Sequence, residues 1–165
     1  MHIIIPFFEK QLKEEVASTR KMLQIIPDDK YDWQPHQKSM TIRRLATHIA
    51  ELPGWIPMAI QTDVLDFAVA DYKPTPIDNT KDLLVIFEDN VRNAFEAISK
   101  TSDEYLQNSW TMKNGKEVYF TITKEDVIRM AISQMIHHRA QMGVFLRLLD
   151  IPIPGPYGPS ADESF

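Results

Sequence analysis

The sequence predicts an all-α protein with a small β-hairpin before the last helix and a Pro-rich C-terminal tail. Three observations predict this fold class: four segments place apolar residues at helical spacing, one Asn-Gly pair stands between two short apolar stretches, and prolines crowd the C-terminal end. The length of 165 residues suits one folded unit, so we expect residues 1–165 to form a single domain.

The first two helical segments are separated by a loop rich in polar residues. We expect the first helix over residues 6–26, since a proline is tolerated in a first turn and the apolar side chains share one face. The second helix is expected to begin near Thr41, with Ser39 or Thr41 as its capping residue. Pro53 lacks the N–H that a continuous helix needs, so we expect a break or kink there, with helix again over residues 55–67.

The second half of the chain contains two further helices and the hairpin. The third helix is expected to begin near Thr80, and the last helix to cover residues 123–149. Thr123 followed by Asp126 resembles a capping box, which supports the start of the last helix. An Asn-Gly pair in the middle of residues 109–120 supplies the positive φ values of a tight turn and predicts the hairpin.

The C-terminal tail cannot be helical. Residues 152–159 contain four prolines, each of which removes a backbone N–H and fixes φ. Two arrangements stay open for this tail: an extended segment packed over the helices, or a loose end.

Composition excludes several classes of protein. Lys and Arg total 18 and Asp and Glu total 23, which gives a formal net charge of −5 and argues against binding to nucleic acid. No cysteine is present, which excludes disulfides, thiolate metal ligands and a cysteine nucleophile. The apolar N-terminal stretch is too short for a signal peptide or a membrane span, so we expect a cytoplasmic protein without membrane contact.

Three polar side chains interrupt the apolar face of the last predicted helix. Gln134, His138 and Gln141 are spaced by four and three residues, which keeps them on one side of the helix. The rest of that face is formed by Val127, Ala131, Phe145 and Leu148. Burying a polar group without a partner costs about 1–3 kcal/mol. These three side chains must therefore form hydrogen bonds with one another, with water or with a ligand.

One histidine of the second helix faces the same interior. His48 shares a helix face with the leucines about one turn away on either side, so we expect it to point inward. Gln134 and His138 can point at one centre with it, and such sites between helices are where bundles bind metals. Ordinary core histidines satisfied by their neighbours are the alternative. His137 is rotated about 100° from His138, so we expect it to face elsewhere.

Several charged side chains lie on the same two helices. Arg43 and Arg44 in the second helix, and Arg139 and Arg147 in the last, could bind an anionic substrate. Pairing with nearby carboxylates is the alternative. Glu51 follows His48 by three residues and could reach the rim of a pocket as a base, with an ordinary solvated charge as the alternative.

Three segments of the chain resemble one protein family. They are TIRRLATHIAELPGW at residues 41–55, HHRAQMGVFLRLL at residues 137–149 and YGPSADE at residues 157–163. Together they are similar to the DinB-like superfamily, and the likeness extends over nearly the whole chain. The resemblance implies an up-and-down four-helix bundle, often a homodimer, and a divalent metal, typically zinc or nickel, held by three histidines.

The three ligands of that family fall on identifiable positions of this chain. The first maps to His48, the last to His138 and the middle one to Gln134, where the family usually has a histidine. Ala140 also replaces a usual glycine. A glutamine oxygen is a neutral and weaker ligand for zinc or nickel than an imidazole nitrogen. Either the site holds metal more loosely, or only a polar pocket remains.

The resemblance implies a divalent-metal-dependent enzyme acting on an unknown small molecule. Its chemistry would be that of a hydrolase or of a transferase of low-molecular-weight thiols, through activation of a bound water or thiol. The alternative is a metal-free bundle that binds a small molecule or a partner through the same polar cleft, with catalysis lost.

Overall fold

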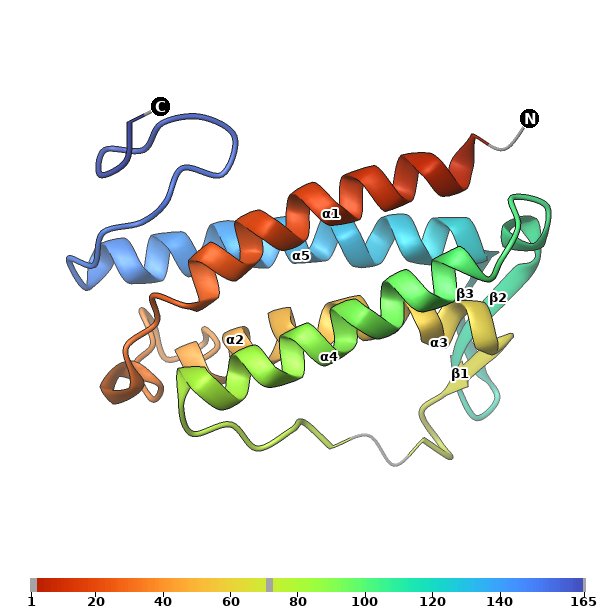
Figure 1. The fold of residues 1–165 in the computed structure, drawn as a ribbon. Helices are drawn as coiled ribbons and strands as arrows, with labels where there is room; N and C mark the ends of the chain where they lie inside the picture. The colour runs from red at the N-terminus through yellow and green to blue at the C-terminus, as the bar shows by residue number, and fades with distance from the viewer. Residues whose placement is uncertain (1–2, 71–72, 165) are drawn as a thin grey trace.

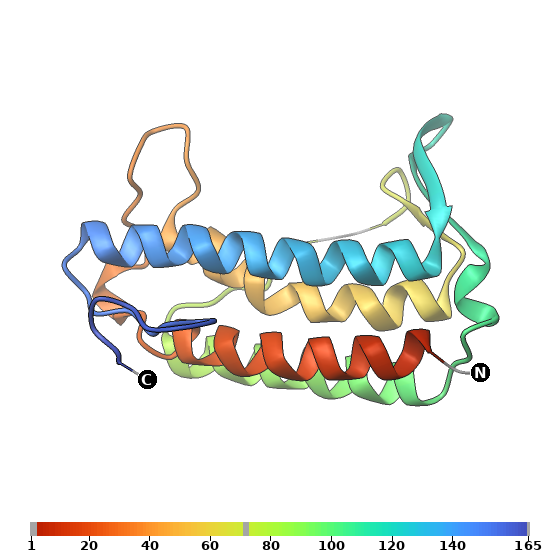
Figure 2. The same cartoon turned by 90° about the horizontal axis from the view of Figure 1, so that it is seen from above.

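The described part of the chain forms a bundle of long helices with a small sheet at one end (Figure 1). The computed structural model describes residues 3–70 and 73–164. Its α-helices are α1 (Ile4–Leu23), α2 (Ile42–Glu51), α3 (Trp55–Gln61), α4 (Thr80–Ser99) and α5 (Lys124–Leu148). Within the described ranges, α2 and α3 follow one another along one rod, so the five α-helices form a four-helix bundle (Figure 2). The expected four-helix bundle is confirmed.

The order of helix directions differs from the simple up-and-down arrangement that we expected. α1 and the α2–α3 rod each pack against both α4 and α5. Asp78, just before α4, pairs with Arg43 at the start of α2, and Asn90 farther along α4 bonds to Ala50. α4 therefore runs parallel to the α2–α3 rod (Figure 1). The connection that precedes α4 is long enough to return along the bundle, since an extended chain spans about 3.3 Å per residue.

α1 begins two residues earlier than the sequence predicts. Its first N–H groups have no local capping side chain. Instead the Asp103 carboxylate accepts hydrogen bonds from the backbone N–H groups of Ile3, Ile4 and Ile5, at 2.6, 3.1 and 3.0 Å. A carboxylate at this position accepts from N–H groups that have no partner inside the helix, and its negative charge interacts favourably with the positive end of the helix dipole. Since this cap lies far away in the sequence, local patterns could not reveal it.

The break between α2 and α3 occurs where Pro53 predicts it. The Thr41 side chain caps the start of α2 by accepting from the N–H of Arg44 at 3.2 Å. A 3₁₀ turn over Leu52–Gly54 separates the two helices. Asn90 donates to the Ala50 carbonyl at 3.0 Å, which provides a partner for an oxygen that the break leaves without its usual helix bond. A Cβ at Gly54 would lie only 2.9 Å from the Asn90 side-chain oxygen, so glycine permits this contact.

α3 ends at Gln61, so the expectation of helix as far as residue 67 is wrong. The fully buried Lys124 ammonium donates to the carbonyls of Ala59 and Thr62 and pairs with Asp63 at 2.8 Å. These contacts provide partners for carbonyls at the end of α3 that have none inside the helix. The positive charge of Lys124 also interacts favourably with the negative end of the helix dipole. The chain then turns into a short strand.

The sheet contains β1 (Val64–Asp66), β2 (Ser109–Asn114) and β3 (Glu117–Thr123), in that spatial order. β2 and β3 are antiparallel and turn at Gly115, whose φ is +60°, so the expected hairpin is confirmed. The expectation of positive φ at both residues of the Asn-Gly pair is wrong, since Asn114 is the last residue of β2, pairs with Glu117 and has no positive φ. β1 pairs in parallel with β2. A three-residue strand has no recognisable period, which explains why it was not predicted.

The later helices begin at their local caps. Asn79 caps α4 and Thr123 caps α5, in each case by accepting from the backbone N–H of Asp82 or Asp126. Both starts agree with the sequence prediction. The buried core includes Leu12 of α1, Ile49 of α2, Phe87 of α4 and Met142 of α5.

Residues 151–164 contain no regular secondary structure and contact the bundle through specific bonds. The Tyr157 hydroxyl accepts from Arg139 at 2.7 Å and donates to the Glu15 carboxylate at 2.8 Å. Arg139 and Glu15 are themselves buried and paired at 2.7 Å between α5 and α1. Asp162 also pairs with Arg147 at the end of α5. This segment is thus tied to α1 and α5.

None of the helices in the described ranges is long and apolar enough to serve as a membrane span.

Candidate metal centre and the adjoining cavity

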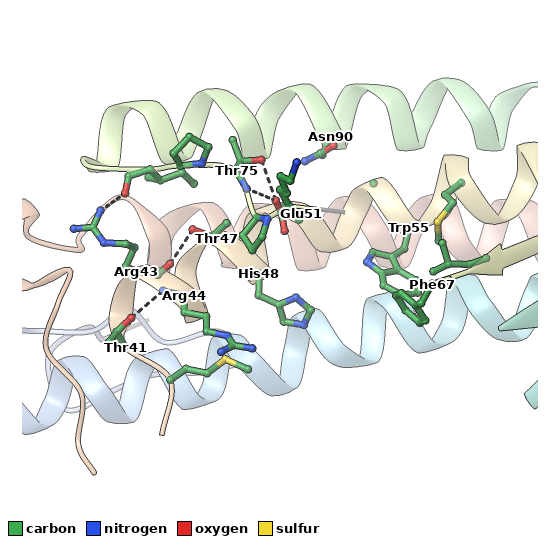
Figure 3. Close-up of a pocket in the computed structure, with 18 residues that line it drawn as sticks. Thr41, Arg43, Arg44, Thr47, His48, Glu51, Trp55, Phe67, Thr75 and Asn90 are labelled. Carbon is green, nitrogen blue, oxygen red and sulfur yellow. Dashed lines mark hydrogen bonds between the residues drawn. The ribbon is translucent and has the colours of Figure 1, made fainter. Parts of the chain in front are cut away.

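Two histidines from different helices meet inside the bundle. His48 lies in the last turn of α2, and its ring points towards α5 (Figure 3). The ring of His138, in the second half of α5, lies 4.8 Å away between centroids, and the two planes are inclined by 72°. Both side chains are half-buried. The helical positions that suggested inward imidazoles therefore bring the two rings into contact.

Gln134 lies beside the two rings. It is one turn before His138 on α5, and its side-chain oxygen lies 3.4 Å from Nε2 of His48. This separation is at the long end for a hydrogen bond, which indicates a weak interaction between the two groups. Two imidazole nitrogens and one amide oxygen thus come together between α2 and α5.

Gln141 orients the His138 ring. Its side-chain oxygen lies 2.7 Å from Nδ1 of His138. An amide oxygen only accepts, so Nδ1 carries the hydrogen and donates it. In the neutral ring the lone pair is then on Nε2. Metal-binding histidines are commonly held in such a form by a hydrogen bond from the other ring nitrogen to a group that does not touch the metal. The spacing of three residues between His138 and Gln141 is the signal that could have indicated this role. The expectation that Gln141 and Leu148 lie on a buried face is wrong. Both are exposed, because the buried face of α5 passes through Met135, Met142 and Leu146.

The surroundings favour the neutral form of His138. Burial lowers the pKa of His138 below its ordinary value, and the nearby His48 and His137 lower it further, although the bond to Gln141 acts in the opposite direction. A neutral imidazole is the form that binds metal ions.

The remaining described histidines, His36 and His137, are exposed and do not belong to this cluster. His137 is exposed, as a neighbour on another side of the helix should be, but its ring still lies 5.0 Å from that of His138. His36 is exposed in the loop before α2, where its Nδ1 accepts from the N–H of Lys38 at 3.1 Å. His2 lies outside the described residues.

The chemistry of the donor set suits a divalent transition metal, with weaker binding than three histidines would give. Among the described residues no group of three or more His, Cys, Asp or Glu side chains could hold a metal ion. The cluster here is of another kind, with His48 and His138 as nitrogen donors and Gln134 as an oxygen donor. Three protein ligands leave positions for water or substrate, as catalytic sites require.

A cavity of about 930 Å³ adjoins His48. Its walls come from α2, α3, β1, the segment before α4 and α4 itself (Figure 3). Glu51 lines this cavity, and its Oε1 accepts from the backbone N–H and the hydroxyl of Thr75 at 3.1 and 2.9 Å. The carboxylate therefore ties the segment around Thr75 to α2 over the cavity.

Three of the four arginines that could bind an anion are paired with carboxylates. Arg139 pairs with Glu15 and Arg147 with Asp162. Arg43 pairs with Asp32 and Asp78 at 3.1 and 2.8 Å. Arg44 is exposed and lines the cavity, and within residues 3–70 and 73–164 no carboxylate pairs with it.

A helical bundle with histidines from two helices facing each other across its interior belongs to a recurrent class of proteins, in which ligand and metal sites are built between helices. Within that class, this chain belongs to the DinB family, whose sequence profile matches residues 8–164.

Comparisons with individual proteins agree with this membership. The chain is 28% identical to the uncharacterised protein YrdA of Bacillus subtilis strain 168, over 94% of this chain and 89% of YrdA. A solved DinB-like protein from Bacillus subtilis shares the fold with a TM-score of 0.71 at 17% identity, covering 90% of this chain and 96% of that one.

Two more distant solved structures carry functional descriptions. YfiT from Bacillus subtilis, called a probable metal-dependent hydrolase with an unusual four-helix bundle topology, has a TM-score of 0.68 at 12% identity and covers 90% of this chain and 89% of its own. A mycothiol-dependent maleylpyruvate isomerase has a TM-score of 0.59 at 13% identity, covering 82% of this chain and 60% of that one. At these identities the likeness shows the fold alone.

Proposed function

We propose that this chain is a divalent-metal-dependent enzyme, a hydrolase or a transferase of low-molecular-weight thiols, in which His48, Gln134 and His138 hold zinc or nickel. The observation that carries the proposal is the contact of two imidazole rings from separate helices, 4.8 Å apart, with an amide oxygen beside them. Membership of the DinB family supports it, as do the descriptions of YfiT and of the mycothiol-dependent isomerase.

The chemistry of such an enzyme depends on the side chains around the proposed ligands. A bound divalent cation acts as a Lewis acid and lowers the pKa of a coordinated water or thiol. Gln141 holds His138 with its Nε2 lone pair free, and burial lowers the pKa of that ring, which favours its neutral form. His48 lies on the wall of the cavity, whereas Gln134 and His138 do not line it, so a small substrate in the cavity would meet the site at His48.

Metal analysis of protein purified without a His tag tests the proposal. We expect the wild type to take up one equivalent of zinc or nickel at micromolar concentration. His48→Ala and His138→Ala should each abolish this uptake, because each removes one of only two nitrogen donors. His36→Ala is the matched control, since His36 is exposed in the loop before α2, outside the proposed ligand set, and its replacement should leave uptake unchanged. Absence of uptake by the wild type, or full uptake by both site variants, contradicts the proposal.

A second candidate function is a metal-free bundle that binds a small molecule through the same cleft. Gln134 favours it, since a neutral amide stands where the family usually has a third imidazole and bonds weakly to His48. Gln134→His separates the two candidates. If the wild type takes up no metal and this variant binds zinc or nickel tightly, the metal-free candidate is supported. Equally tight binding by both proteins excludes it.

A further inference from the structure

We propose that the cavity beside His48 binds a small organic anion with an apolar body, and that Arg44 binds the anionic group. Binding of this anion does not require the proposed metal. Only if the anion is also the substrate does the inference rest on the proposed function.

The charges of the cavity favour an anion although the whole chain is acidic. The net charge of the chain is −5, but three basic side chains and one acidic side chain line this cavity. Of the basic ones, Arg43 is compensated by two aspartates, which leaves, among the side chains that line the cavity, Arg44 and Lys73 against the one carboxylate. The acidic one is Glu51, whose Oε1 accepts two hydrogen bonds from Thr75. A cavity with an excess of one sign of charge attracts ligands of the opposite sign.

Arg44 is the cavity arginine with its donors available. The neighbouring Arg43 is occupied by Asp32, by Asp78 and by the carbonyl of Ile77. No contact joins the Arg44 guanidinium to a carboxylate of the described chain, and the Thr41 side chain accepts from the backbone N–H of Arg44, not from its guanidinium. A guanidinium offers a planar fork of donors that matches a carboxylate in a bidentate arrangement.

The opposite end of the cavity is apolar. Trp55 and Met58 of α3 lie there with Leu65 of β1 and Phe67, which directly follows β1. Phe67 is 40% exposed, so its ring presents a free surface to the cavity mouth. Aromatic faces and a methionine are typical walls for an apolar ligand body.

His48 lies between the two ends. Figure 3 shows its ring between Arg44 and the rings of Trp55 and Phe67. The side chains at positions 44, 48 and 55 share one face of the α2–α3 rod, and at 1.5 Å per residue the face from Arg44 to Trp55 extends roughly 16 Å. A ligand with its anionic group at Arg44 and its body against Trp55 would pass His48 with its central atoms.

NMR titration with 4-phenylbutyrate and 6-phenylhexanoate, each compared with its uncharged amide, tests the inference. We expect at least one acid to bind both the EDTA-treated and the zinc-supplemented protein, and to bind more tightly than its amide. Arg44→Gln should weaken the acid about tenfold or more, because a charged hydrogen-bonding partner is lost, and should leave amide binding unchanged. Arg44→Lys should bind the acid more weakly than the wild type but more tightly than Arg44→Gln, because lysine keeps the charge and lacks the planar fork. Phe67→Ala should weaken acid and amide alike.

Arg92→Gln is the control of equal charge change, since Arg92 is exposed on α4 and pairs with Asp89. It should leave the affinity unchanged. The inference is overturned if neither acid binds, if acid and amide bind equally, or if Arg44→Gln binds the acid like the wild type. Metal uptake is measured on the same samples. Binding of the acid by a protein that takes up no metal contradicts the proposed function alone, whereas metal uptake without acid binding contradicts this inference alone.

Discussion

At the scale of single residues, the candidate centre depends on side chains that orient its ligands. His138 is held by Gln141 at 2.7 Å, and this bond sets which ring nitrogen is free. The contact of His48 with His138 follows from residue spacing on two helices, so the sequence could predict it. The walls of the cavity depend on side-chain directions and on the segment around Thr75, which no local pattern reveals.

Gln141→Leu should weaken metal binding by about 10- to 100-fold, the usual effect of removing a partner that orients a histidine ligand. The leucine keeps the size of the side chain but cannot accept from Nδ1. Titration with zinc in the presence of a competing chelator measures the change. Gln37→Leu, in the exposed loop before α2, is the matched control. Equal affinity of Gln141→Leu and the wild type would show that Gln141 does not orient the site.

Lys124 is a second residue whose role is visible only in the folded chain. Lys124→Met should lower the free energy of unfolding by about 2–3 kcal/mol, because a charged donor to the Ala59 and Thr62 carbonyls is lost. Urea unfolding followed by circular dichroism measures this loss. Lys100→Met changes an exposed lysine and should have little effect. A loss no larger than that of Lys100→Met would refute this role for Lys124.

At the scale of elements, local signals predicted three helix starts and distant contacts decided the rest. Thr41, Asn79 and Thr123 each cap the helix that follows them. The sequence predicted Thr123 as a cap, Thr41 as one of two alternatives and a helix start near Thr80, without naming Asn79. The start of α1 depends on Asp103, about a hundred residues away. The pairing of β1 with β2 and the parallel course of α4 are likewise long-range features, which periodicity does not encode.

The segment after α5 provides a test at this scale. Burial raises the pKa of Tyr157, and its bond to Glu15 raises it further, although Arg139 acts in the opposite direction. A raised pKa means that folding favours the protonated phenol. This stabilisation is complete below the unfolded pKa, about 10, and is lost as the pH rises through the higher folded pKa.

Tyr157→Phe should therefore be less stable than the wild type at pH 7, by about 0.5–1.5 kcal/mol for the lost hydrogen bonds. The difference should disappear at pH values above the folded pKa, where the ionised phenol no longer stabilises the fold. Urea unfolding of both proteins from pH 7 to pH 11 measures it. A difference that stays constant over this range would contradict the role given to the hydroxyl.

At the scale of the whole molecule, the proposed ligands join two rods of the bundle. His48 belongs to α2 and His138 to α5, so a metal ion held by both would bind the folded state and not the unfolded chain. Zinc at 100 times its dissociation constant should then stabilise the protein by about 2.7 kcal/mol. Thermal unfolding with zinc and then with excess EDTA measures this effect, and His48→Ala should show none. An equal zinc effect in that variant would locate the ion elsewhere.

The most direct measurement is anomalous X-ray diffraction at the nickel edge from crystals of the wild type grown with nickel. We predict one strong anomalous peak between α2 and α5, about 2.0–2.2 Å from a ring nitrogen of His48, a ring nitrogen of His138 and the side-chain oxygen of Gln134. A nickel-containing crystal with no peak there, or with its peak at His36 or His137 only, would contradict the central claim.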